Sequence, residues 1–84
     1  MLTLNKLRIF KQYAGDLDAL RHANSADKDA ITSHDWFVIG NLLQDIRLVN
    51  RSLASEAYAG RVEEALEGAC DNQATIDELR KMAE

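Results

Sequence analysis

Four side chains with oxygen atoms that could bind a calcium ion follow one another in and after the polar segment of residues 24–32. They belong to Asp27, Asp29, Ser33 and Asp35. A calcium loop that begins at Asp27 needs a glycine at its sixth position for a sharp turn and a glutamate at its twelfth to complete the coordination shell. Those positions hold Thr32 and Val38. The pattern therefore predicts an acidic loop followed by the start of a helix, where the helix dipole favours carboxylates.

The two histidines are the residues best suited to acid–base chemistry near neutral pH. His34 precedes Asp35, but no nucleophile with an assignable geometry accompanies it, and a histidine is common in the first turn of a helix. His22 follows Asp18 by four residues, which predicts a surface contact along one helix rather than a pair of metal ligands. Neither histidine predicts a catalytic or metal site.

Carboxylates and a thiol lie near the C-terminal end of the chain. Glu56, Glu63 and Glu67 share a ridge at helical spacing, but a di-metal bundle would also need a Glu-x-x-His motif, which the sequence lacks. A solvated face is the prediction. Cys70, the only cysteine, falls on an apolar stripe and is expected to be a buried, unreactive thiol. We therefore predict that the protein is not an enzyme and that it uses no cofactor and no small-molecule substrate.

The bulk composition predicts one helical domain over residues 1–84. The chain is 46% apolar and 29% charged and contains no proline, the residue that most often breaks helices. We predict an all-α fold, a small antiparallel bundle of three main helices and a short C-terminal one. Their expected ranges are about 4–23, 33–52, 55–70 and 76–83.

Capping signals set these boundaries. Thr3 is the expected N-cap of the first helix, in which Gly15 is expected to mark a bend rather than an end. A helical turn is expected after Ser25 in the loop. Two pairs have the spacing of a capping box, and each precedes a predicted helix: Thr32 with Asp35, and Thr75 with Glu78. For the central helix Ser33 is an alternative N-cap, and its weakly signalled end leaves a bent continuation into the next helix open.

The central segment has apolar residues on two sides. Its wider face is expected to form the core: Trp36, Val38, Ile39, Leu42, Leu43, Ile46, Val49 and Leu53. Phe37 and Leu48 lie three helical turns apart on the opposite side. Flanking helices or a second copy must cover that side, and Gly40 would allow another helix to approach closely. Phe37, Leu48 and Tyr58 are therefore the candidate interaction patch.

Charge is distributed unevenly along the chain. The net charge is −4, but residues 1–24 carry four positive and two negative charges, whereas residues 55–84 carry three positive and eight negative ones. We expect the basic first helix to lie beside the acidic C-terminal half. DNA binding would need the basic residues gathered on one face, and the helical spacing of Lys6, Arg8, Lys11 and Arg21 does not gather them.

The leading functional hypothesis is a small, soluble protein–protein interaction or structural module that forms a homodimer or binds another protein. The alternative is a DNA-associated transcriptional regulator or accessory protein with a helix-turn-helix. Lys6 and Arg8 interrupt the apolar N-terminal segment, and the longest uninterrupted apolar run covers only residues 36–39. These features predict no membrane association and a cytoplasmic location.

Overall fold

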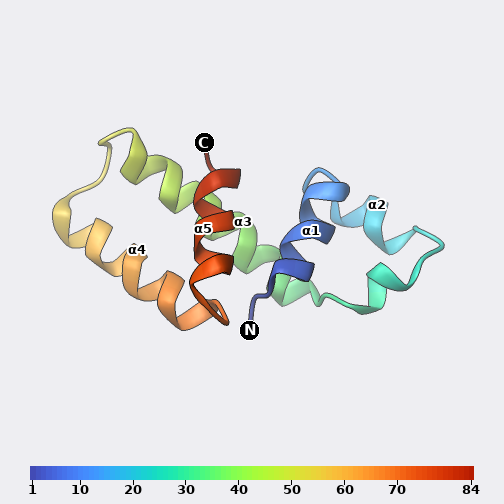
Figure 1. The fold of residues 1–84 in the computed structure, drawn as a ribbon. Coiled ribbons are helices and arrows are strands. Elements are labelled where there is room, and N and C mark those ends of the chain that lie inside the picture. The colour runs from blue at the N-terminus through green and yellow to red at the C-terminus, as the bar shows by residue number, and fades with distance from the viewer.

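The computed structural model describes all 84 residues and contains five α-helices, one 3₁₀ helix and no strand, which confirms the predicted all-α fold (Figure 1). In chain order the elements are α1 (Leu4–Gln12), α2 (Leu17–Arg21), η1 (Ala26–Asp29), α3 (Ser33–Asn50), α4 (Glu56–Ala69) and α5 (Gln73–Met82). The ranges of α3 and α4 agree with the predicted ones to within two residues, because both helices have a clear apolar period.

Side-chain oxygens cap every helix at its N-terminus, as the free backbone N–H groups of a first turn require. The caps are Thr3, Asp16, Ser25, Thr32, Ser55 and Asn72. The predicted capping box is confirmed: Thr32 Oγ1 accepts a hydrogen bond from the Asp35 backbone at 3.0 Å, and the Asp35 carboxyl accepts one from the Thr32 backbone at 3.5 Å. The helical turn expected after Ser25 is present as η1.

The predicted start of the last helix is wrong by three residues. Asn72, not Thr75, is the N-cap of α5, and its side-chain oxygen accepts a hydrogen bond from the Thr75 backbone at 3.2 Å. The side chain of Thr75 is buried, and its hydroxyl donates to Asp71. Thr75 therefore lies in the first turn of the helix, and the burial of its side chain holds this turn in place.

The single helix expected over residues 4–23 is instead two helices. Ala14 and Gly15 have left-handed backbone angles, with φ of 50° and 75°, and these angles cannot belong to a right-handed helix. The break is held from the core: the indole of Trp36 packs against the ring of Phe10 at 4.7 Å and donates from Nε1 to the Gly15 carbonyl at 3.2 Å. The turn redirects the chain so that Leu20 of α2 is fully buried.

The long helix α3 is the axis of the molecule. Figure 1 shows α5 crossing in front of the middle of α3, with α1, α2 and η1 grouped near its N-terminal end and α4 diverging from its C-terminal end. The shape is elongated, 43 × 22 × 19 Å. The radius of gyration of 13.1 Å exceeds the value of about 12 Å typical of 84 residues. Each helix therefore buries less of its surface against the other helices than in a rounder domain.

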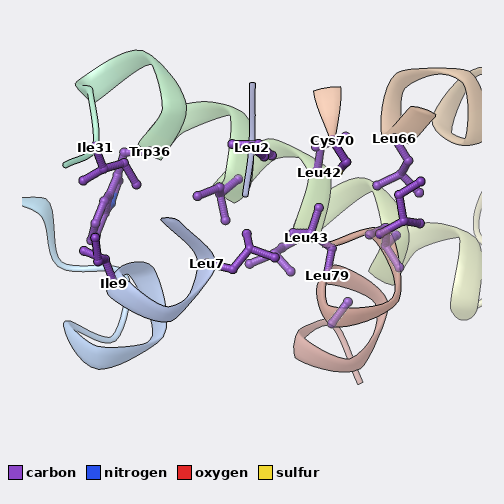
Figure 2. Packing of buried hydrophobic residues seen from close by; sticks show 14 of the residues in the cluster. Leu2, Leu7, Ile9, Ile31, Trp36, Leu42, Leu43, Leu66, Cys70 and Leu79 are labelled. Atoms are coloured by element: carbon purple, nitrogen blue, oxygen red, sulfur yellow. The ribbon is translucent and has the colours of Figure 1, made fainter. Parts of the chain in front are cut away.

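The core follows α3 from end to end. Figure 2 shows Trp36 between Ile9 and Ile31 at one end, and Leu43 close to Leu7 in the middle. The buried apolar residues of α3 are those that the apolar period predicts, with Val38 and Val49 half-buried at the edges, and the paired Asp35 is buried beside them.

Leu53 is the exception to the predicted core, with 68% of its surface exposed. Helix α3 ends at Asn50, and Ser52 has a left-handed φ of 57°, so the chain turns away before Leu53 can continue the apolar face. The same turn shows that α3 and α4 are separate helices rather than one bent helix.

Candidate functional site

The side of α3 that faces away from its buried residues is the candidate site. At 100° per residue, Phe37, Asn41, Gln44 and Leu48 lie within about 60° of one another on this side, and none carries a charge. Phe37 is 63% exposed, the two amides are exposed and Leu48 is half-buried. We call these four residues the outer face of α3.

Neighbouring helices do not cover this face at Phe37. A Cβ placed on Gly40 would meet no atom within 4 Å, so the close helix approach expected at this glycine does not occur within the chain. The N-terminal end of the face borders a shallow hollow of about 270 Å³. Its lining comes from three parts of the chain: Phe10, Gly15, Leu17, Trp36, Phe37, Gly40 and Asn41.

The C-terminal end of the face borders a second hollow of about 290 Å³, between α3 and α4. Leu48, Leu53, Tyr58 and Arg61 line it, together with the loop between the two helices. The structure therefore brings Leu48 and Tyr58 together, whereas Phe37 lies about 16 Å from Leu48 along the helix. Sequence reasoning missed Leu53, whose exposure depends on the turn at Ser52.

Polar contacts fix the position of Tyr58 at this hollow. Its hydroxyl donates to the Asp45 carboxylate, and the Arg61 guanidinium lies 5.8 Å from the centre of its ring. The hydrogen bond to Asp45 raises the pKa of Tyr58, burial and the charge of Asp45 raise it further, and Arg61 opposes the shift. The uncharged Tyr58 side chain is thus held in one orientation, and its ring lines the hollow.

The acidic residues considered for calcium do not converge. Asp27 pairs with Arg8 at 3.2 Å, Asp35 pairs with Lys6 at 2.8 Å, and Ser33 accepts a hydrogen bond from Arg21. No group of three or more His, Cys, Asp or Glu side chains is arranged to hold a metal ion. Burial raises the pKa of Asp35, but the bonds from Lys6 and Thr32 and the charge of Lys6 outweigh it and leave the pKa below its usual value.

The histidines make few contacts of their own. His34 is exposed and lines a hollow with Met1 and Gly68. The contact expected between His22 and Asp18 is made with the backbone instead: His22 Nδ1 lies 2.8 Å from the Asp18 carbonyl oxygen. Neither arrangement places a nucleophile beside an imidazole.

The remaining candidates near the C-terminal end have the exposure or burial that the sequence predicts. Glu56, Glu63 and Glu67 are all exposed, and Glu63 pairs with Arg80 of α5. Cys70 is a free thiol, only 5% exposed, and burial together with the charge of Asp71 raises its pKa. A raised pKa lowers the fraction of reactive thiolate.

The basic residues are spread over different parts of the structure. Lys11 pairs with Glu78 at 3.0 Å, which places α1 beside α5 of the acidic C-terminal half, as the charge distribution predicted. Lys6 and Arg8 pair with aspartates, and Arg21 donates to the carbonyls of Lys28 and Ile31. Phosphate binding by these four residues would have to compete with their present contacts.

None of the helices combines the length and the apolarity needed to cross a membrane. Comparison of the chain with protein-family models, with curated proteins and with solved structures finds no match. Function is therefore inferred from the geometry of the outer face of α3 and its two flanking hollows.

Proposed function

We propose that this protein is a small protein–protein interaction module that works as a homodimer, joined through the outer face of α3. The observation that carries the proposal is Phe37, an aromatic residue left 63% exposed on an uncharged helix face. Full burial of a fully exposed phenylalanine contributes about 1.5–3 kcal/mol, and Phe37 retains the larger part of that exposure. Leu53, 68% exposed at the far end of the same side, adds a second apolar contact.

The shape of this surface suits a protein better than a small ligand. Both hollows are shallow and open, and they lie at opposite ends of a helix face rather than in one enclosed site. Sites for small molecules usually enclose most of the ligand, whereas a protein partner can fill two shallow depressions at once. The face also has a polar centre in Asn41 and Gln44, which allows a soluble monomer.

A reducing compartment, the cytoplasm, is part of this proposal. Its support is Cys70, the single cysteine, which is buried as a free thiol beneath the N-terminal residues. Proteins of oxidising compartments with so small a core usually gain stability from disulfides.

Light scattering coupled to size-exclusion chromatography tests the proposed dimer. At about tens of micromolar the wild type should have twice the mass of one 9.4 kDa chain. Phe37→Asp combined with Leu48→Asp should give a folded monomer, because four carboxylates would lie in the contact. A wild-type monomer at this concentration would remove the proposal.

A matched control separates the position of the new charges from their number. Ala65→Asp combined with Ala74→Asp adds the same two charges at exposed sites on α4 and α5. This control should remain a dimer. Circular dichroism of both variants checks that the helices are intact.

A further inference from the structure

The outer face of α3 has the same pattern in both directions along the helix. Its midpoint falls between residues 42 and 43. The two apolar residues, Phe37 and Leu48, are equally far from this point on either side, and so are the two amides, Asn41 and Gln44. In an isologous dimer the same patch from each copy must complement itself. A face with this symmetry complements its own copy when the two helices run antiparallel.

The two apolar residues also have complementary shapes. Phe37 protrudes, with 63% of its surface exposed, whereas Leu48 is half-buried beside the hollow of about 290 Å³ that Leu53 and Tyr58 also line. A parallel pairing would place the two Phe37 rings against each other and leave the hollow beside Leu48 empty in each copy. An antiparallel pairing places each ring over the partner's hollow.

Charge does not oppose the contact of this face with its copy. The four residues carry no charge, although 29% of the chain is charged and the exposed sides of α4 and α5 carry ions of both signs. At the centre, each amide can donate and accept a hydrogen bond, so Asn41 of one copy can pair with Gln44 of the other. Antiparallel helices also align their dipoles favourably.

We propose that two copies pair through α3 in antiparallel orientation, with Phe37 of each copy over Leu48 of the other and Asn41 against Gln44. This inference rests on the proposed homodimer and adds its geometry. A stable interface needs about 600 Å² from each copy, roughly one ninth of the 5225 Å² surface of the chain. One helix face alone is too narrow, so Leu53 and Tyr58 must contribute at both ends.

A charge swap at the two ends tests the orientation. Phe37→Lys and Leu48→Asp are prepared as separate proteins, each of which should dissociate at concentrations where the wild type is dimeric. In the antiparallel dimer their mixture places the introduced lysine against the introduced aspartate at one end and keeps a native contact between Phe37 and Leu48 at the other. The mixture should therefore associate at least about tenfold more tightly than either variant alone.

The matched control uses the same positions with like charges. A mixture of Phe37→Lys and Leu48→Lys should stay dissociated, because two lysines would meet at the altered end. Circular dichroism identifies any variant that fails to fold. If the mixture with opposite charges associates no better than this control while the wild type is a dimer, the antiparallel geometry is wrong and the homodimer survives.

Spin labels provide a measurement that leaves the face intact. The labels are attached to cysteines introduced by His34→Cys or Arg51→Cys in a Cys70→Ala background, at exposed positions beyond the two ends of the face. In the antiparallel dimer, equivalent labels should be separated by about 25 Å along the helix axis, whereas a mixture labelled at position 34 in one copy and 51 in the other should give a short distance. Short distances between equivalent labels would contradict the inference, and a wild-type monomer would remove both proposals.

Discussion

The indole N–H of Trp36 donates to the backbone carbonyl of Gly15 across 21 positions of sequence, at 3.2 Å. This bond connects the N-terminal end of α3 to the turn between α1 and α2. Since the Trp36 ring also packs on Phe10, the break in the N-terminal helix and the end of the core are one structural unit. The turn needs left-handed backbone angles at Ala14 and Gly15, and only glycine adopts such angles without strain.

Of the substitutions at these two neighbouring residues, only the one at Gly15 should lower stability. Gly15→Ala should lower the free energy of unfolding by about 1–2 kcal/mol, because alanine is strained at a φ of 75°, although its Cβ would make only an ordinary contact with the Phe10 ring at 3.4 Å. Ala14→Gly should leave it unchanged or raise it by up to about 1 kcal/mol, because it relieves the same strain. Urea unfolding measures both. Destabilisation by Ala14→Gly equal to that by Gly15→Ala would mean that backbone strain does not control this turn.

The ion pair of Lys6 with Asp35 should make stability depend on pH in the acidic range. The pKa of Asp35 lies below its ordinary value of 3.8 in the folded protein, so its stabilising contribution is fully present above about pH 4 and is lost as the pH falls through the folded pKa. The difference in unfolding free energy between wild type and Asp35→Asn should therefore be constant near neutral pH and shrink at low pH. Chemical unfolding at a series of pH values measures it.

The Asp35 carboxyl itself provides the check on that prediction. Lys6→Met removes the cation at 2.8 Å, and the pKa of Asp35, followed by NMR of its carboxyl carbon, should rise. A pKa that does not move would show that Thr32 alone holds the carboxylate. A stability difference independent of pH would contradict the assigned role of the ion pair.

The N-terminal residues should protect the core at the junction of α4 and α5. Leu2 is 1% exposed, accepts a hydrogen bond from Asp71 and donates one to Ala69 at 2.7 Å, and lies beside Cys70. Leu2→Ala should cost about 2–4 kcal/mol and should speed the reaction of Cys70 with iodoacetamide.

The matched control for that substitution is Leu4→Ala. Leu4 is 48% exposed, so the same chemical change should alter stability by less than about 0.5 kcal/mol and leave the Cys70 reaction rate unchanged. If Leu4→Ala cost as much as Leu2→Ala, the N-terminal segment would not act through burial of Leu2.

The hydrogen bond from Tyr58 to Asp45 should be visible in the titration of the phenol. In a Tyr13→Phe background Tyr58 is the only tyrosine, and its ultraviolet phenolate absorbance should report a pKa above 10. Because the folded pKa is raised, this contribution to stability is present below about pH 10 and is lost as the pH rises through the folded value. Asp45→Asn should lower the pKa toward its ordinary value. An unchanged pKa in that variant would contradict the assigned contact.

Much of the local structure could be read from the sequence because its causes are local. The apolar period of residues 36–46 requires a buried helix, and the polar caps at Thr3 and Thr32 act on backbone groups within three residues. The exposed ridge of glutamates on α4 follows from the same periodicity. These features need no information about the rest of the fold.

The candidate site was predicted only in part. Periodicity placed Phe37 and Leu48 together on the side of α3 away from the core, and the structure places them there. Periodicity could not show that Phe37 remains exposed while Leu48 lines a hollow with Leu53. That difference depends on where α4 begins and how it diverges from α3.

The sequence by itself determined that this chain is helical, where its longest helices begin and which side of α3 forms the core, because neighbouring residues decide these properties. The tertiary structure decided the break at Gly15, the earlier start of α5 and the exposure of Leu53. Each of these depends on partners or turns outside the local period: the Trp36 indole, the buried site of Thr75 and the left-handed turn at Ser52. Contacts between distant parts of a chain overrule helix propensity wherever a turn buries side chains that stabilise the fold more than another helical residue would.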